Sequence, residues 1–319
     1  MNAQNKHIEY QKDHCWQYDI RLNNLEQDLK ESDLSLSEVQ SLTISDFTFR
    51  AVDKDDSTMC RNIRSFIERH EWLGKLGLYP THRFVAEYKG KLAGVVIFDQ
   101  PNSFSKLLGE DTKKLERLIS RGACVSWSPP SLASALIMFS IKHMVKNTRY
   151  RLFTAYSDVE AKELGTIYQA CNFIYLGKGS GTSYMFLDPN NKAKGWFSDR
   201  SFRSRSAWKR YARELGIEWQ RNWQGAKTNK HKDWANSTAE TRSGSESILW
   251  ENIPEDIAKR LKEASKAHQR LCEKRKSPSK HKYCYILGEN KKETRELRRL
   301  FDELNPTKIN LKYPKVRGE

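Results

Sequence analysis

The order of strand-like and helix-like segments between residues 47 and 187 constrains the fold of this chain more than any other feature. Runs rich in β-branched and aromatic residues predict strands, and apolar residues at a spacing of three and four predict amphipathic helices. The predicted elements are a strand (47–52), a helix (59–74), the two strands of a hairpin (83–88 and 92–98), a strand (120–127), a helix (131–145), a strand (151–157), a helix (160–171) and two closing strands (173–177 and 182–187). Such a mixed order is typical of a three-layer α/β fold.

The flanks of this region differ from it in composition. Residues 1–45 are polar and in places acidic, and we interpret them as an N-terminal extension of the α/β domain, which is expected to span residues 46–190. Residues 1–190 carry 24 Lys and Arg against 23 Asp and Glu, whereas residues 191–319 carry 32 against 17. Almost the whole net charge of +16 therefore belongs to the C-terminal region. A basic region of this kind indicates contact with nucleic acid.

Candidate phosphate-contacting residues lie in two places of the C-terminal region. The segment around Trp208 and Tyr211 has basic residues at spacings that can share one helix face. Two further lysines lie at positions 280 and 282. A solvated charged helix would look similar, but it would not explain the uneven division of charge. The residues predicted to bind nucleic acid are Arg203, Arg205, Lys209, Arg210, Arg213, Lys280 and Lys282.

Membrane insertion, disulfides and metal binding are not expected. No run approaches the roughly 20 apolar residues that a spanning helix needs, and the first residues have no apolar signal core, so a soluble cytoplasmic protein is predicted. The six cysteines are scattered without a CxxC pair and are expected to be reduced thiols. Cys272, His281 and Cys284 have a loose spacing that matches no standard zinc finger, so no metal site is predicted.

Six segments together resemble the Mom-type family of phage DNA-modification proteins, which is similar to GNAT N-acyltransferases in fold. The resemblance spans about residues 47–223 and 280–316, and its most specific part is residues 156–177. The segments are ERHEWLG (68–74), LAGVVIF (92–98), WSPPSLAS (127–134), AYSD (155–158), GTIYQACNFIYLG (165–177) and KHKYCYILG (280–288).

The resemblance implies a GNAT-like mixed central sheet flanked by helices, with a basic C-terminal extension. It also implies a transferase that adds a carbamoylmethyl or acyl-type group to a base of double-stranded DNA, with adenine N6 as the expected target. The founding type makes an N6-carbamoylmethyl adenine that blocks restriction enzymes, so the expected location is the cytoplasm of an infected bacterium. Where Ser131 stands, relatives tend to carry Asn, and the pyrophosphate-binding glycines of ordinary acetyltransferases are missing. The donor therefore stays open between an acyl-CoA and an aminoacyl-tRNA.

The catalytic candidates lie at the end of the strand 151–157 and in the helix that follows it. Tyr168 occupies the helix that resembles the one where acyltransferases keep a tyrosine near the leaving group, and a phenol there can protonate a departing thiolate or alkoxide. The alternative is a tyrosine packed on the sheet. Asp158, beside Tyr156, can orient an amine or act as a base, or it can cap the next helix.

Donor and acceptor candidates lie at two further turns. The helix N-terminus after WSPPS can point backbone N–H groups at an anionic donor, although a serine there can equally be a simple cap. Trp72 can stack on a base taken out of the duplex, although the adjacent histidine can equally be structural. The predicted donor-binding residues are Ser126, Ser131, Ser134 and Gly165, and the predicted acceptor-pocket residues are His70, Glu71 and Trp72.

Two other functions fit the same sequence. One is a GNAT-type transfer of an acyl or aminoacyl group to tRNA, to a protein or to a small amine. The other is a nucleic-acid-binding protein that has kept the fold without the chemistry. Binding of tRNA without preference for duplex DNA would favour the former.

Overall fold

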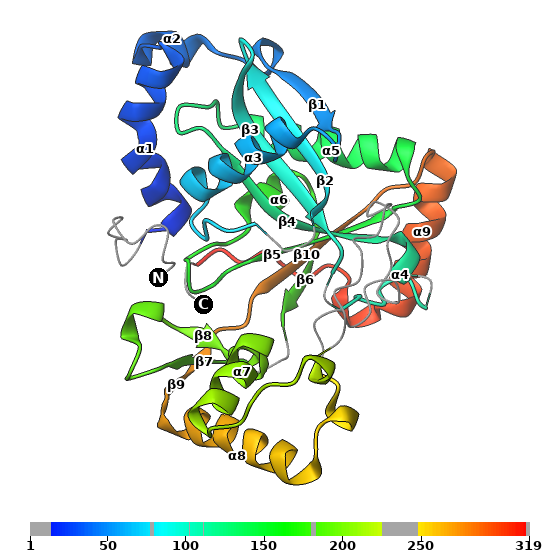
Figure 1. Cartoon of the computed structure of the whole chain (residues 1–319). Coiled ribbons are helices and arrows are strands. Elements are labelled where there is room, and N and C mark those ends of the chain that lie inside the picture. Colours follow the sequence, from blue (N-terminus) through cyan, green and yellow to red (C-terminus); the bar gives the residue numbers. More distant parts are fainter. Residues whose placement is uncertain are drawn as a thin grey trace. The chain divides into compact units, whose positions relative to one another are not determined.

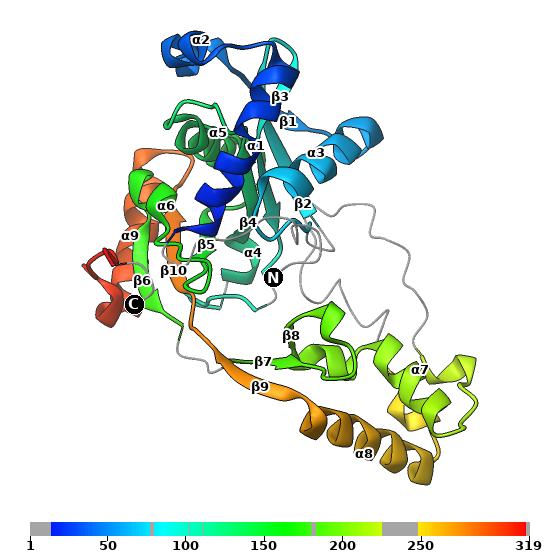
Figure 2. The same cartoon turned by 90° about the vertical axis from the view of Figure 1, so that its left-hand side faces the viewer.

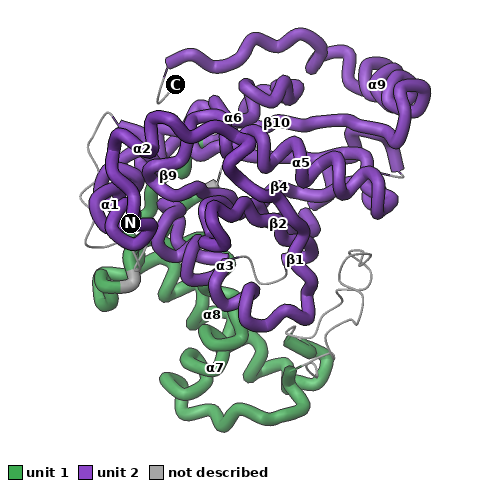
Figure 3. Tube along the Cα trace, turned by 90° about the horizontal axis from the view of Figure 1, so that it is seen from above, with its two compact units in different colours: residues 1, 181–233, 239–278 green, residues 2–180, 234–238, 279–319 purple. Residues whose placement is uncertain are grey.

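A computed structural model describes residues 14–76, 80–101, 103–110, 112–179, 183–224 and 248–316. The chain forms two compact units (Figure 3). The larger unit contains the described residues up to 179 and from 279 onward, and the smaller unit contains those between 183 and 278. The smaller unit is thus an insertion in the chain of the larger one, and the units differ in extent from the segments 46–190 and 191–319 expected from the sequence.

The larger unit is built on a seven-stranded sheet with the order β1-β2-β3-β4-β5-β10-β6 (Figure 1). Neighbouring strands are antiparallel except for β4 and β5, which are parallel, so the sheet is mixed as predicted. The strands are β1 (Thr48–Val52), β2 (Pro80–Tyr88), β3 (Lys91–Asp99), β4 (Glu116–Cys124), β5 (Leu152–Ser157), β6 (Ile174–Lys178) and β10 (His281–Ile286).

Helices cover both faces of this sheet. Helix α3 (Ser57–His70) lies on one face and α5 (Leu132–Asn147) on the other, as Figures 1 and 2 show, and the intervening strand β3 is buried from Ala93 to Phe98. Asp56 caps the start of α3, because its carboxylate accepts from Met59 N at 2.9 Å. The other helices of the unit are α1 (Trp16–Ser32), α2 (Leu36–Ser41), α4 (Thr112–Leu115), α6 (Thr166–Ala170) and α9 (Lys291–Leu304). These layers confirm the predicted α/β class. No described helix has the length and apolarity that crossing a bilayer requires.

The parallel pair of strands separates before either strand ends. Pairing runs from Glu116 and Leu152 to Ile119 and Ala155. Beyond these residues, among the described strands, β4 pairs with β3 and β5 pairs with β10. The sheet therefore opens between the carboxyl ends of β4 and β5.

The smaller unit has its own sheet, with the order β8-β7-β9. Its elements are β7 (Ser183–Leu187), β8 (Phe197–Ser198), α7 (Arg205–Glu214), α8 (Glu255–Leu271) and β9 (Glu273–Ser277). Aromatic side chains fill its interior, among them Phe186, Phe202 and Tyr211. The expectation that residues 182–187 close the main sheet is wrong, because β7 pairs with β8 and β9 while β10 takes the place beside β6.

Candidate active site

Loops of the larger unit meet where β4 and β5 separate. The turn after α3 reaches β4, because Arg121 Nε lies 3.6 Å from Glu71 Oε2. The same turn reaches the loop after β5, because Trp72 Nε1 donates to Glu163 Oε1 at 2.9 Å. The other oxygen of Glu163 accepts from Asp158 N at 2.8 Å. Two carboxyl groups and an indole are therefore held together at the opening of the sheet.

Both carboxyl groups have raised pKa values. Glu71 is 8% exposed, and burial raises its pKa to about 8. Arg121 opposes this rise, and the charge of Glu163 adds to it. Burial also raises the pKa of Glu163, against hydrogen bonds from Asp158 N and Trp72. A carboxyl group that exchanges a proton near pH 8, as Glu71 does, is suited to general acid and base chemistry.

Tyr168 is placed beside this pair by a left-handed turn. Gly165 precedes α6 with φ of 64°, and a Cβ on it would lie 2.5 Å from the ring of Tyr283. The half-buried ring of Tyr168 packs on Tyr283 and Phe173, with centroid distances of 5.4 and 5.3 Å. Burial raises the pKa of Tyr168, and the charges of Glu163 and Glu71 raise it further. Tyr168 is thus packed against its neighbours, as expected for a tyrosine packed on the sheet. Its hydroxyl group also stays protonated, which a general acid requires.

Charged groups at the ends of β5 and β10 border the cluster. Asp158 Oδ2 lies 2.8 Å from Lys280 Nζ, and Asp158 Oδ1 accepts from Glu160 N at 3.0 Å in a turn. Tyr156 is 38% exposed, and Lys282 Nζ lies 5.9 Å from the centre of its ring. Lys280 and Lys282, two of the residues predicted to bind nucleic acid, thus flank the predicted catalytic residues Asp158 and Tyr156.

His70 and Ser126 lie instead against α1. His70 is 5% exposed, with Nε2 3.1 Å from Asp28 Oδ1. Ser126 N donates to Asp28 Oδ2 at 2.9 Å, and Arg21 donates to the carbonyl oxygen of Ser126 at 2.9 Å. Both residues therefore make structural contacts, which hold the turn after α3 close to the end of β4.

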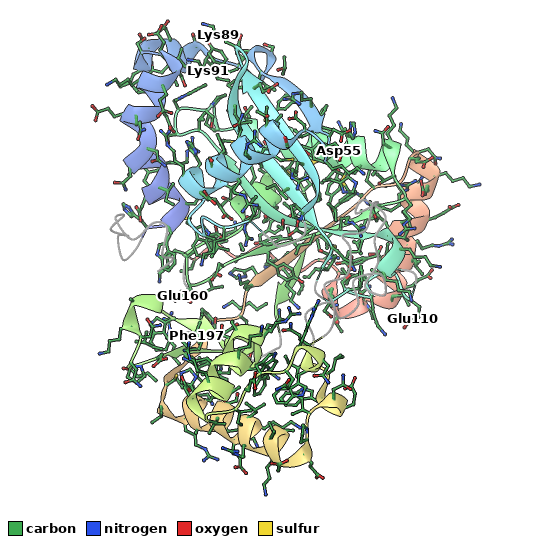
Figure 4. The ribbon with its side chains drawn as sticks, in the orientation of Figure 1. Asp55, Lys89, Lys91, Glu110, Glu160 and Phe197 are labelled. Carbon is green, nitrogen blue, oxygen red and sulfur yellow. The ribbon has the colours of Figure 1, made fainter. Side chains whose placement is uncertain are left out.

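Helix α1 also holds the two loops that carry Trp72 and Glu163. Gln17 donates to the carbonyl oxygen of His70 at 2.6 Å and accepts from Trp72 N at 3.2 Å. Trp16 N donates to the carbonyl oxygen of Ala161 at 3.1 Å, and its ring meets Trp72 edge-on at 5.3 Å. At the far end of the helix, Lys91, labelled in Figure 4, donates to the carbonyl oxygen of Glu31 at 2.7 Å. The N-terminal segment is therefore part of the site's framework.

The two serines at the start of α5 differ in their hydrogen bonds. Ser134 Oγ donates to the carbonyl oxygen of Ser131 at 2.9 Å, within its own turn. Ser131 is exposed at the N-cap position, and no described backbone N–H bonds to its hydroxyl group. Of the three predicted donor-binding serines, Ser131 is exposed, whereas Ser126 and Ser134 are half-buried.

The remaining predicted nucleic-acid contacts lie in the smaller unit. Lys209 and Arg213 are exposed on α7. Arg203 forms an ion pair with Asp199, and Arg205 and Arg210 are half-buried. Trp208 and Tyr211 are 5% and 1% exposed, so these rings pack in the interior and are not available to stack on bases.

Sequence reasoning missed Glu163 and Arg121. A glutamate in the loop after a strand and an arginine within a strand have no pattern that separates them from surface charges. Their role is visible only because the turn after α3 folds across the ends of β4 and β5.

Comparisons with known proteins give a family and distant similarities to solved structures. The model of the Mom protein family matches residues 60–233, more than half of the chain. The N-acetyltransferase of Staphylococcus aureus Mu50 is 18% identical over 43% of this chain and 87% of its own, with a TM-score of 0.30. Spermidine/spermine N-acetyltransferase of Vibrio cholerae is 18% identical over 46% and 84%, with a TM-score of 0.29. A GNAT-family acetyltransferase of Listeria monocytogenes is 17% identical over 55% and 88%, with a TM-score of 0.27. No curated protein matches.

Proposed function

The chain belongs to the Mom protein family, and on that premise we propose that it is a transferase that modifies a base of double-stranded DNA. The proposed acceptor is the N6 amino group of adenine, and the group added is of carbamoylmethyl or acyl type, which protects the DNA from restriction. The observation that carries the proposal is the cluster of Glu71, Glu163 and Tyr168 at the opening of the sheet.

The chemistry assigned to this cluster is the movement of two protons. The amino nitrogen attacks the electrophilic carbon of the donor, and a C–N bond forms while the bond from that carbon to the leaving sulfur or oxygen breaks. Ionised Glu71 accepts the proton that the nitrogen loses, and the hydroxyl group of Tyr168 donates a proton to the leaving group. The proton held by Glu71 then passes to the phenolate of Tyr168, so that both groups return to their starting forms.

The surrounding residues position the acceptor in this proposal. Glu163 fixes the indole of Trp72, which supports a base that has left the duplex. Asp158 and Lys280 form an ion pair at the rim, where the amine and the DNA backbone would arrive. The proposed donor is an acyl-CoA or an aminoacyl-tRNA, either of which can place its phosphates at the start of α5 beside Ser131.

Nucleoside mass spectrometry on DNA from bacteria that express the protein tests this function. The wild type is expected to give a mass-shifted adenine nucleoside, and Tyr168→Phe to lower its amount by about 100-fold or more. Tyr18→Phe, at an exposed tyrosine on α1, is the matched control and should leave the product unchanged.

The pH dependence identifies the base. Because Glu71 must be ionised, the rate of the wild type should rise as pH increases toward about 8, and Glu71→Gln should be slow at every pH. Glu110→Gln, at a surface ion pair with Lys106, is the control. Unmodified DNA together with modified tRNA or protein would contradict the choice of acceptor, and wild-type cells without any modified product would contradict the enzyme.

A further inference from the structure

Three metal-ligand side chains come together in the smaller unit. Asp188 follows β7, His268 lies in the last turn of α8, and Cys272 directly follows that helix. His268 Nε2 lies 2.9 Å from Asp188 Oδ2, and the ligand atoms of all three residues lie within 4.8 Å of one another. Among the residues that the structure describes, this is the only such group of three or more.

The local fold brings these residues together. His268 and Cys272 are four positions apart, one helical turn, so both face the same side of the end of α8. In the ladder between β7 and β9, Leu187 is the last residue of β7 and is opposite Glu273, the first residue of β9. Asp188 follows Leu187 in the chain, and Cys272 precedes Glu273. Asp188 is 5% exposed and Cys272 is 7% exposed. A carboxylate, an imidazole and a thiol thus lie together inside the smaller unit.

We propose that Asp188, His268 and Cys272 bind a zinc ion, with water as the fourth ligand. Oxygen, nitrogen and thiolate sulfur in a tetrahedral arrangement form a donor set that zinc accepts in proteins. The ion would link the residue after β7 to the end of α8. The set differs from Cys272, His281 and Cys284 considered in the sequence, because His281 and Cys284 belong to β10 of the larger unit.

Zinc binding requires a defined movement of protons. The thiol of Cys272 releases its proton to solvent. His268 coordinates through Nε2 as a neutral imidazole, so its one ring proton resides on Nδ1. Tyr211 Oη lies 2.9 Å from Nδ1 and can accept that hydrogen bond.

Arg210 is a competitor for the same nitrogen. Its Nη2 also lies 2.9 Å from His268 Nδ1, and a guanidinium group has only donors, so this contact requires Nδ1 to be unprotonated. Arg210 Nε lies 3.6 Å from Glu214 Oε1, and the side chain turns to that carboxylate when zinc is bound. Removing Arg210 is therefore expected to strengthen zinc binding.

Metal analysis of the purified full-length chain tests the site. After incubation with zinc and removal of the excess, the wild type should retain one zinc ion per chain, and Cys272→Ser and His268→Ala should retain none. Cys60→Ser, at a half-exposed cysteine of the larger unit, should retain the ion. Arg210→Ala should keep the ion at chelator concentrations that strip the wild type.

Cobalt(II) substitution of the wild type separates the proposal from misfolding of the variants. A thiolate-to-cobalt charge-transfer band is expected, together with a higher unfolding temperature on addition of zinc. Absence of the band in the wild type, or an equal zinc content in folded Cys272→Ser, would overturn the site. Neither measurement depends on the proposed transferase activity.

Discussion

Burial of Glu71 couples the stability of the molecule to pH. The carboxyl group has a pKa of about 8 in the folded chain and an ordinary value of 4.5. Between these values the folded state holds a proton that the unfolded state has lost. The free energy of unfolding is therefore expected to fall as pH rises through this window, by up to about 1.4 kcal/mol per pH unit.

Glu71→Gln should remove this contribution, because an amide does not titrate. Urea unfolding at a series of pH values measures it, and Glu110→Gln should keep the wild-type slope. An equal slope in the wild type and in Glu71→Gln would contradict the raised pKa.

Gly165 allows the close approach of α6 to Tyr283. We expect Gly165→Ala to lower the free energy of unfolding by about 2 to 4 kcal/mol, because a left-handed alanine is strained and its Cβ would overlap the ring. Gly90, with φ of 76° and nothing within 4 Å of its virtual Cβ, is the matched control. Gly90→Ala should cost only about 1 kcal/mol in the same urea titration. Equal costs would show that contact with Tyr283 contributes nothing.

Individual residue types could be predicted from the sequence, but not their partners. Tyr168, Asp158, Glu71 and Trp72 were candidates, and the structure brings all four to the opening of the sheet. Glu163, which links them, gave no signal because its effect depends on loops that meet only in the fold.

One buried carboxylate of helix α1 makes several contacts with the rest of the larger unit. Asp28 is 3% exposed, and it bonds to Arg69, to His70 and to Ser126 N. Asp28→Asn removes the charge that these groups share, and we expect it to lower the free energy of unfolding by about 3 to 5 kcal/mol.

The control for Asp28 is its neighbour on the same helix. Glu31 also contacts Arg69, but its side chain is 52% exposed, so Glu31→Gln should cost less than about 1 kcal/mol. Similar losses in the two variants, measured by urea unfolding, would contradict the importance of the buried pair.

At the level of elements, the sequence predicted the hairpin of β2 and β3, the helices α3 and α5, and the strand β5, because each has a strong apolar pattern. The polar contacts of α1 could not be predicted, since side chains such as Gln17 and Asp28 follow no apolar pattern. The separate sheet containing β7 was missed because an apolar strand does not specify its neighbours.

The positive charge is distributed over the inserted and the returning parts of the chain. Residues 181–278 carry 21 Lys and Arg against 12 Asp and Glu, and residues 279–319 carry 11 against 6.

If the smaller unit contacts phosphates through α7, Lys209→Ala with Arg213→Ala should weaken duplex binding. The slope of log affinity against log salt should then fall by about 2. Lys142→Ala with Lys146→Ala, at exposed positions of α5, is the control. An unchanged slope in the first pair would exclude α7 from the interface.

The position of β10 sets an order of events during synthesis. Leu152 of β5 pairs with Ile286, yet the whole smaller unit is translated between these two strands. Until residues 281–286 leave the ribosome, one edge of β5 has no partner strand, and an unpaired apolar edge invites aggregation. Gly179 N donates to the carbonyl oxygen of Lys280 at 3.0 Å, so the inserted chain leaves and re-enters at one point. Early folding of the smaller unit brings these ends together, so that β10 can pair with β5 soon after residues 281–286 leave the ribosome.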